Sequence, residues 1–94
     1  MEFEFDPKKN ASNLERHGID FIDAQDLWDV AHVVVPASGS VKERRQALVG
    51  RLEGRLYVVI FTMRETRIRL ISCHRGGGQW EKIYASYVLK QKES

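Results

Sequence analysis

Four arginines gather on and around one short segment of the chain, and their spacing suits them to bind phosphate. Arg67 and Arg69 are two residues apart in the segment RIRLISC, whose composition predicts a β-strand. Since successive side chains of a strand point to opposite faces, the two guanidiniums share one face about 7 Å apart and can grip adjacent phosphates or clamp one. Arg64 before the strand and Arg75 after it extend the cluster, and arginine stays charged at neutral pH. The alternative is a set of solvated arginines paired with nearby carboxylates, those of Glu43, Glu53 or Glu65.

His74 is the one histidine beside this cluster, which makes it the candidate for proton transfer. An imidazole accepts or donates a proton near neutral pH. The alternative is a histidine at the end of a strand that bonds only to the backbone. His17 falls at the predicted C-terminus of a helix, where a protonated ring suits the helix dipole, and we interpret it as structural. Gly76, Gly77 and Gly78 precede a predicted helix and indicate either an anion-binding nest or a flexible hinge.

The remaining reactive side chains do not form a site of another kind. The three histidines and the single cysteine, Cys73, are scattered, and the acidic residues near them form no metal-ligand pattern. We therefore expect neither a metal nor a cofactor. Lys8 and Lys9 fall in the first turn of a predicted helix, where positive charge opposes the dipole. They either face RNA or a partner or are simply solvated lysines.

Length and charge set the class of protein. The 94 residues, of which 30% are charged and 43% hydrophobic, suffice for a single globular domain over residues 1–94. A single cysteine allows no internal disulfide and fits the reducing cytoplasm, and we expect no export signal and no membrane segment. Residues 1–40 carry three basic and eight acidic side chains, whereas residues 41–82 carry ten basic and four acidic ones. This asymmetry suggests a basic surface for a polyanion and an acidic surface for a basic partner, unless folding interleaves the two halves.

The elements that must hold these residues follow from the spacing of apolar positions. A helix is predicted from Pro7 to His17, with Asp6 as N-cap, Gly18 as the left-handed residue at its end, and Ala11 and Leu14 facing inward. A second helix begins after Asp20 with a buried stripe of Phe21, Ala24, Leu27 and Trp28. A C-terminal helix carries Trp80, Ile83, Tyr84 and Tyr87 and fades into the charged tail from Lys90 to Ser94.

Strands are predicted at residues 2–5, 33–35, 45–52, 56–63 and 67–73. Pro36 ends the second of these and leads into a loop over residues 37–40, while residues 53–54 and 64–66 form turns. Residues 57–61 are apolar throughout, which is typical of a central strand covered on both faces. The sequence thus predicts an α+β fold in which two N-terminal helices and a C-terminal helix pack on a twisted, mainly antiparallel sheet.

Several segments of the chain resemble a known family. The run FEFDPKKNASNLERHGIDFIDAQDL resembles the opening of the BrnT toxins, whose pattern is roughly F-x-W-D-P-x-K-x-x-x-N-L-x-x-H-G-x-x-F-x-x-A. The matching positions are Asp6, Pro7, Lys9, Asn13, Leu14, His17, Gly18, Phe21 and Ala24. Further on, Glu43 and Arg44 resemble the family's E-R-x-x-x-x-G strand, RIRLIS resembles its R-I-R-I-I-S strand, and Tyr84 occupies the tyrosine position of its last helix. The similarity covers most of the chain.

The resemblance implies a RelE-like fold and a ribonuclease toxin of a bacterial type II toxin–antitoxin module. Such an enzyme cleaves RNA without metal, by attack of the ribose 2′-OH on the neighbouring phosphate, and so inhibits translation. It also implies a BrnA-like antitoxin with a ribbon-helix-helix part, through which the complex reaches operator DNA. The arginine-bearing strand agrees with this chemistry.

The chain departs from the family pattern after this strand. Where the family has S-A-R-[KR]-A-[ST]-x-x-E, the chain has SCHRGGGQW, so His74 replaces the usual arginine and Trp80 the usual glutamate, with Glu81 one position on. Either His74 supplies proton transfer and Arg75 charge stabilisation, or the site is weakened or lost.

The first hypothesis is therefore a metal-independent RNA endonuclease. Its candidate catalytic residues are Arg64, Arg67, Arg69, His74 and Arg75, and its secondary candidates are Lys9, Glu43, Arg44, Glu81 and Tyr84. The alternative is a noncatalytic member of the same fold that binds only its antitoxin or RNA.

Overall fold

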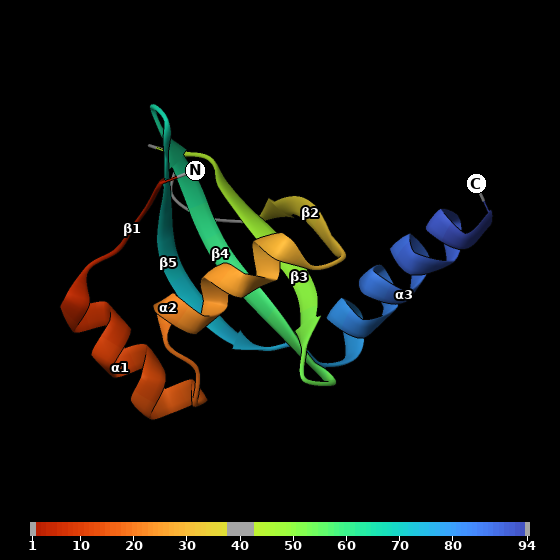
Figure 1. Ribbon diagram of the computed structural model, residues 1–94, viewed down its shortest axis with the longest axis horizontal. Helices are drawn as coiled ribbons and strands as arrows, with labels where there is room; N and C mark the ends of the chain where they lie inside the picture. Colours follow the sequence, from red (N-terminus) through yellow and green to blue (C-terminus); the bar gives the residue numbers. More distant parts are fainter. Residues whose placement is uncertain (1, 38–42, 94) are drawn as a thin grey trace.

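A five-stranded sheet in the order β1-β5-β4-β3-β2 forms the centre of the computed structural model, which describes residues 2–37 and 43–93 (Figure 1). The strands are β1 (Glu2–Glu4), β2 (His32–Ala37), β3 (Arg45–Leu52), β4 (Arg55–Arg64) and β5 (Arg67–Arg75). β1 pairs parallel with β5, and the other pairs are antiparallel. The predicted α+β class and mainly antiparallel sheet are confirmed.

The central position predicted for residues 57–61 is confirmed, because β4 lies between β3 and β5 and is covered on both faces. The β3–β4 hairpin turns at Glu53 and Gly54, whose φ angles of 52° and 79° are the positive values that a two-residue hairpin loop requires. β5 continues two residues beyond its predicted end, so that His74 and Arg75 belong to the strand.

The first predicted helix is confirmed as α1 (Pro7–His17). The Asp6 side chain accepts the Lys8 N–H at 2.9 Å, and Gly18, with φ 72°, donates its N–H to the Leu14 carbonyl at 2.8 Å. These two caps fix both ends of the helix where the sequence predicts them.

The inward face predicted for α1 is wrong. Ala11 is exposed and Leu14 is 46% exposed, whereas Asn13 is buried. The reason is that α1 lies along the edge of β5 beyond the end of β1, where the strand backbone lacks a neighbouring strand (Figure 1). Asn13 supplies the missing partner, because its Oδ1 accepts the Cys73 N–H at 3.0 Å, while its Nδ2 donates to the Ile19 carbonyl at 3.0 Å.

The second predicted helix is one α-helical turn, α2 (Phe21–Ala24), followed by a 3₁₀-helix, η1 (Gln25–Asp29). Asp20 caps it as predicted, accepting the Asp23 N–H at 2.8 Å. The predicted stripe is confirmed in that Phe21, Ala24 and Leu27 are fully buried and Trp28 packs against them.

β2 passes through Pro36 rather than ending there. The proline is tolerated because β2 is an edge strand, where its missing N–H removes no ladder hydrogen bond. The predicted loop at residues 37–40 lies outside the described residues except for Ala37, which belongs to β2.

The C-terminal helix α3 (Gly78–Glu93) covers part of the sheet face opposite α2 and η1. Trp80 and Tyr84 pack against it, and the rest of the helix extends past the sheet and further into the tail than predicted (Figure 1). A Cβ at Gly76 would lie 2.9 Å from Leu56 Cδ2 and 3.2 Å from Val58 Cγ2, so this glycine permits close packing of strand and helix. No described helix is long and apolar enough to cross a membrane.

Candidate functional site

Three of the predicted arginines meet at one end of the sheet, and we call them the arginine cluster: Arg64, Arg67 and Arg69. Arg64 pairs with Arg67 across β4 and β5, and Arg69 is the next residue of β5 on the same face. By the strand register this is the face that carries Ile60 and Val58, away from α2 and η1. The prediction that Arg67 and Arg69 share a face is confirmed.

Each arginine of the cluster faces a carboxylate. Arg67 Nε lies 3.0 Å from Glu2 Oε2, Arg69 Nη1 lies 3.6 Å from Glu4 Oε2, and Arg64 Nη2 lies 3.8 Å from Glu43 Oε2. Glu43 was expected as a partner, whereas the two carboxylates of β1 were not. They are in place because parallel pairing sets Glu2 opposite Arg67 and Glu4 opposite Arg69. The Arg64 and Arg67 side chains remain more than half exposed, so a phosphate can reach them.

His74 and Arg75 lie at the opposite end of β5. His74 is seven positions after Arg67, which corresponds to about 23 Å along an extended strand. The residues that the sequence grouped as one site therefore form two clusters on one strand. At this second end, the Arg75 guanidinium carbon lies 5.9 Å from the centre of the Tyr57 ring.

A residue that the sequence assigned to structure joins His74 at this end. The ring centroids of His17 and His74 are 6.0 Å apart, and His74 Nδ1 lies 3.0 Å from the Arg75 carbonyl oxygen. His17 is the last residue of α1, and the hydrogen bond from the Cys73 N–H of β5 to Asn13 brings that end of the helix to the end of the strand. No sequence signal pairs two histidines 57 positions apart, because only the docking of α1 on the sheet edge brings them together.

The secondary candidates divide between exposed and bridging positions. Lys9 and Arg44 are exposed, and the Arg44 carbonyl accepts the Thr62 hydroxyl at 2.7 Å. Glu81 and Tyr84 both contact Arg51 of β3. Glu81 Oε2 lies 2.7 Å from Arg51 Nη2, and the Arg51 guanidinium carbon lies 5.4 Å from the centre of the Tyr84 ring. These contacts attach α3 to the sheet, which is a structural task.

Cys73 is buried between β5 and α1, and desolvation raises the pKa of its thiol from 9.0 to about 12. It is therefore a neutral thiol at physiological pH rather than a nucleophile. Within residues 2–37 and 43–93, the His, Cys, Asp and Glu side chains form no group of three or more that could hold a metal ion.

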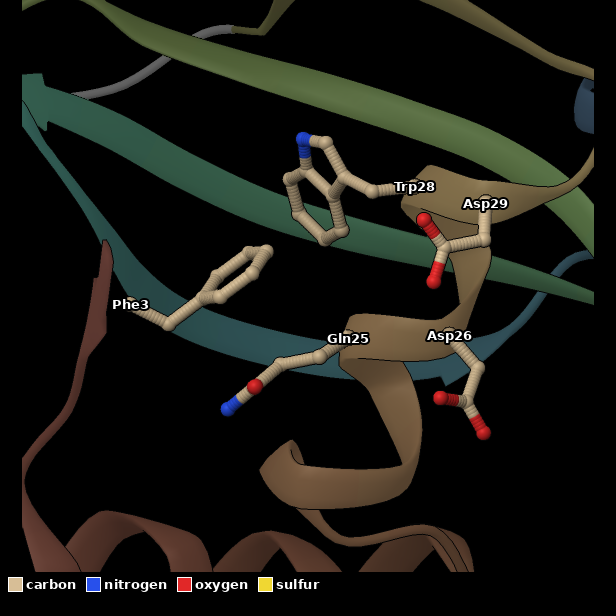
Figure 2. Close-up of a pocket in the computed structure, with 5 residues that line it drawn as sticks. All are labelled: Phe3, Gln25, Asp26, Trp28 and Asp29. Carbon is tan, nitrogen blue, oxygen red and sulfur yellow. The ribbon is translucent and has the colours of Figure 1, made fainter. Parts of the chain in front are cut away.

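A hollow of about 390 Å³ lies on the other side of the sheet, beside η1 (Figure 2). Phe3 and Trp28 form its aromatic wall, with ring centroids 5.0 Å apart, and Gln25, Asp26 and Asp29 line it from η1. Two carboxylates repel the phosphates of RNA, so this hollow suits a cation rather than a nucleic acid. It also shows that part of the acidic N-terminal half gathers away from the arginine cluster.

Comparison with protein families identifies the chain. The model of the ribonuclease toxin BrnT of type II toxin–antitoxin systems matches residues 5–76. The chain belongs to the BrnT family. The match to BrnT extends from the residue before Asp6 to the residue after Arg75, so it contains the arginine cluster, His17 and His74 and leaves α3 outside. No curated protein matches the chain.

Proposed function

We propose that the chain is a metal-independent RNA endonuclease, acting as one RelE-like domain in the cytoplasm. Membership of a family of ribonuclease toxins supplies the reaction class. The observation that carries the proposal is β5, which bears the arginine cluster at one end and the His74 imidazole at the other, on the same face of the sheet. A basic strand that ends in a proton-transfer group is what cleavage of a polyanion by acid–base catalysis requires.

In the proposed reaction the ribose 2′-oxygen attacks the adjacent phosphorus. The 2′-OH proton passes to His74 as the P–O bond forms, and the bond to the 5′-oxygen breaks as that oxygen takes up a proton. The products are a 2′,3′-cyclic phosphate and a free 5′-OH. The reaction uses no water nucleophile and no metal ion. The exposed guanidiniums of Arg64 and Arg67, with Arg69, hold the flanking RNA backbone and Arg75 stabilises the negative charge on phosphorus.

The partner that type II toxins require is an antitoxin. We propose a BrnA-like antitoxin with a ribbon-helix-helix part, which binds operator DNA and brings the toxin to it indirectly. The acidic hollow at Asp26 and Asp29 offers a basic segment of such a partner a site away from β5.

A second candidate function follows from the ion pairs of the arginine cluster. Because Glu2 and Glu4 occupy Arg67 and Arg69, the strand could be neutralised and the protein could act only by binding its antitoxin or RNA. This version predicts salt-sensitive RNA binding without cleavage.

The test uses protein refolded free of antitoxin, incubated with end-labelled RNA in excess EDTA. The wild type should cleave the RNA, and the Arg67→Ala/Arg69→Ala double variant should cleave at least ten-fold more slowly. Arg55→Ala serves as the matched control, because Arg55 is an exposed arginine of β4 at the hairpin end. RNA that stays intact with folded wild type, or equal rates for the double variant and the control, would contradict the proposal.

A further inference from the structure

We propose that His17 is a second catalytic residue and forms an acid–base pair with His74, an inference that rests on the proposed ribonuclease function. Cleavage by 2′-OH attack needs one group to remove the 2′-OH proton and another to protonate the leaving 5′-oxygen. The structure places two imidazoles on adjoining elements, with ring centroids 6.0 Å apart. Rings this close together can both serve one bound phosphodiester, one at the 2′-oxygen and one at the 5′-oxygen.

The surroundings of His74 assign it the role of base. Its Nδ1 lies 3.0 Å from the Arg75 carbonyl oxygen, and a carbonyl oxygen only accepts hydrogen bonds. Nδ1 therefore carries the proton, and the Nε2 of the neutral ring is left as the acceptor. His74 is half-buried on β5, so its ring is held by the strand while the residue remains partly accessible to solvent.

His17 has the features of the acid. It is exposed and is the last residue of α1, where a protonated ring interacts favourably with the helix dipole. Its position is fixed, because Asn13 ties the helix to β5 and Gly18 ends it one residue later. An exposed proton donor on a fixed element can meet the leaving oxygen of a bound substrate.

The charge around the pair also favours a phosphate at this place. Arg16 precedes His17 on α1 and is exposed, and Arg75 follows His74 at the exposed end of β5, where its guanidinium lies over Tyr57 on the face of the sheet opposite His74. In the described part of the chain neither arginine lies within 4 Å of a carboxylate, whereas every member of the arginine cluster does. Positive charge without a competing carboxylate therefore lies at the histidine end of β5, and this end is the better site for charge that develops on phosphorus.

The proton balance of the step is complete with the two histidines. His74 takes the 2′-OH proton and becomes cationic, while His17 gives its proton to the 5′-oxygen and becomes neutral. The P–O bond to the 2′-oxygen forms and the bond to the 5′-oxygen breaks. Exchange of protons with water then restores both rings for the next turnover.

The experiment compares two RNA substrates of one sequence, in EDTA, once the wild type has shown where it cuts. The first is ordinary RNA, and the second carries sulfur in place of the bridging 5′-oxygen at that position. A thiolate leaves without being protonated, so it does not need the acid. His17→Ala should lose about 10²–10⁴-fold in kcat/KM on ordinary RNA and stay near wild type on the sulfur substrate. His74→Ala should lose activity on both.

His32→Gln is the matched control, because His32 lies on β2 and bonds the Val30 carbonyl through Nδ1 at 2.7 Å. It should cleave both substrates like the wild type. Thermal unfolding of each variant shows whether it is folded, and added imidazole should restore part of the cleavage that His17→Ala loses.

The outcomes separate the two proposals. A folded wild type that cuts neither substrate overturns the proposed function. A wild type that cuts ordinary RNA while His17→Ala cuts it equally well leaves that function standing and overturns the role of His17. Equal losses on both substrates in folded His17→Ala would also overturn its role as the acid.

Discussion

Replacing Asn13 by alanine is expected to destabilise the fold by about 1.5–5 kcal/mol. Asn13 is buried, with only 7% of the residue exposed. Its side chain donates a hydrogen bond to the Ile19 carbonyl and accepts one from the Cys73 N–H, and both bonds are 3.0 Å long. Alanine leaves these two buried backbone groups without partners, at a cost of about 1–3 kcal/mol each. The higher helix propensity of alanine offsets about 0.6 kcal/mol of that loss.

Urea unfolding followed by circular dichroism measures this loss as a lower midpoint at unchanged slope, since small proteins unfold with slopes of about 1–3 kcal/mol per molar urea. Ser12→Ala is the control, because Ser12 is the exposed neighbour on the same helix and its replacement should change stability by less than about 0.5 kcal/mol. If the Asn13 and Ser12 variants unfold at the same urea concentration, Asn13 does not tie α1 to the sheet edge as argued.

The packing at Gly76, the buried thiol of Cys73 and the ion pair of Glu4 can each be tested by one substitution. Gly76→Ala should lower the free energy of unfolding by about 1–3 kcal/mol, because the added Cβ would lie 2.9 Å from a Leu56 methyl. In Gly77→Ala the added Cβ meets no atom within 4 Å, so this control should unfold like the wild type. Equal urea midpoints for the two variants would show that Gly76 is not needed for close packing. The folded state keeps the Cys73 proton up to a pKa of about 12, whereas the unfolded chain loses it above 9.0. Wild-type stability should therefore fall relative to Cys73→Ala by about 1.4 kcal/mol between pH 8 and pH 10, and a constant difference in urea unfolding would count against it. Glu4→Gln removes the carboxylate that lies 3.6 Å from Arg69, so this variant should bind uncleavable 2′-O-methyl RNA several-fold more tightly than the wild type does. Fluorescence anisotropy measures the binding, and Glu53→Gln is the control that should bind like the wild type. Unchanged binding by Glu4→Gln would show that the ion pair does not compete with RNA.

Local chemistry in the sequence predicts much of the fold. The Asp6 cap, the Gly18 end of the first helix and the two-residue turn at Gly54 depend on neighbours a few positions away, and all three are confirmed. The wrong inward face of α1 has a tertiary cause. The helix α1 packs against an edge of β5 that has no neighbouring strand, and such an edge needs a hydrogen-bonding side chain rather than an apolar one. The sequence alone does not reveal that edge.

The candidate site divides in the same way. Strand periodicity places Arg67 and Arg69 on one face, because that depends on two neighbouring residues. Neither the β1 carboxylates that face them nor the approach of His17 to His74 follows from spacing, because each joins segments more than fifty residues apart. The split of the predicted site into two ends of β5 follows from strand length, once the strand is known to continue to Arg75.

In the proposed reaction the nucleophile is the 2′-OH of the RNA itself. The decisive experiment replaces the single ribose at the mapped cleavage position with deoxyribose and incubates both RNAs with the folded protein in EDTA. Cleavage at that position should disappear, while the all-ribose RNA should yield a 2′,3′-cyclic phosphate and a 5′-OH. Cleavage that continues at the deoxyribose would rule out the 2′-OH as nucleophile, because the attacking oxygen would then have to come from water or from the protein.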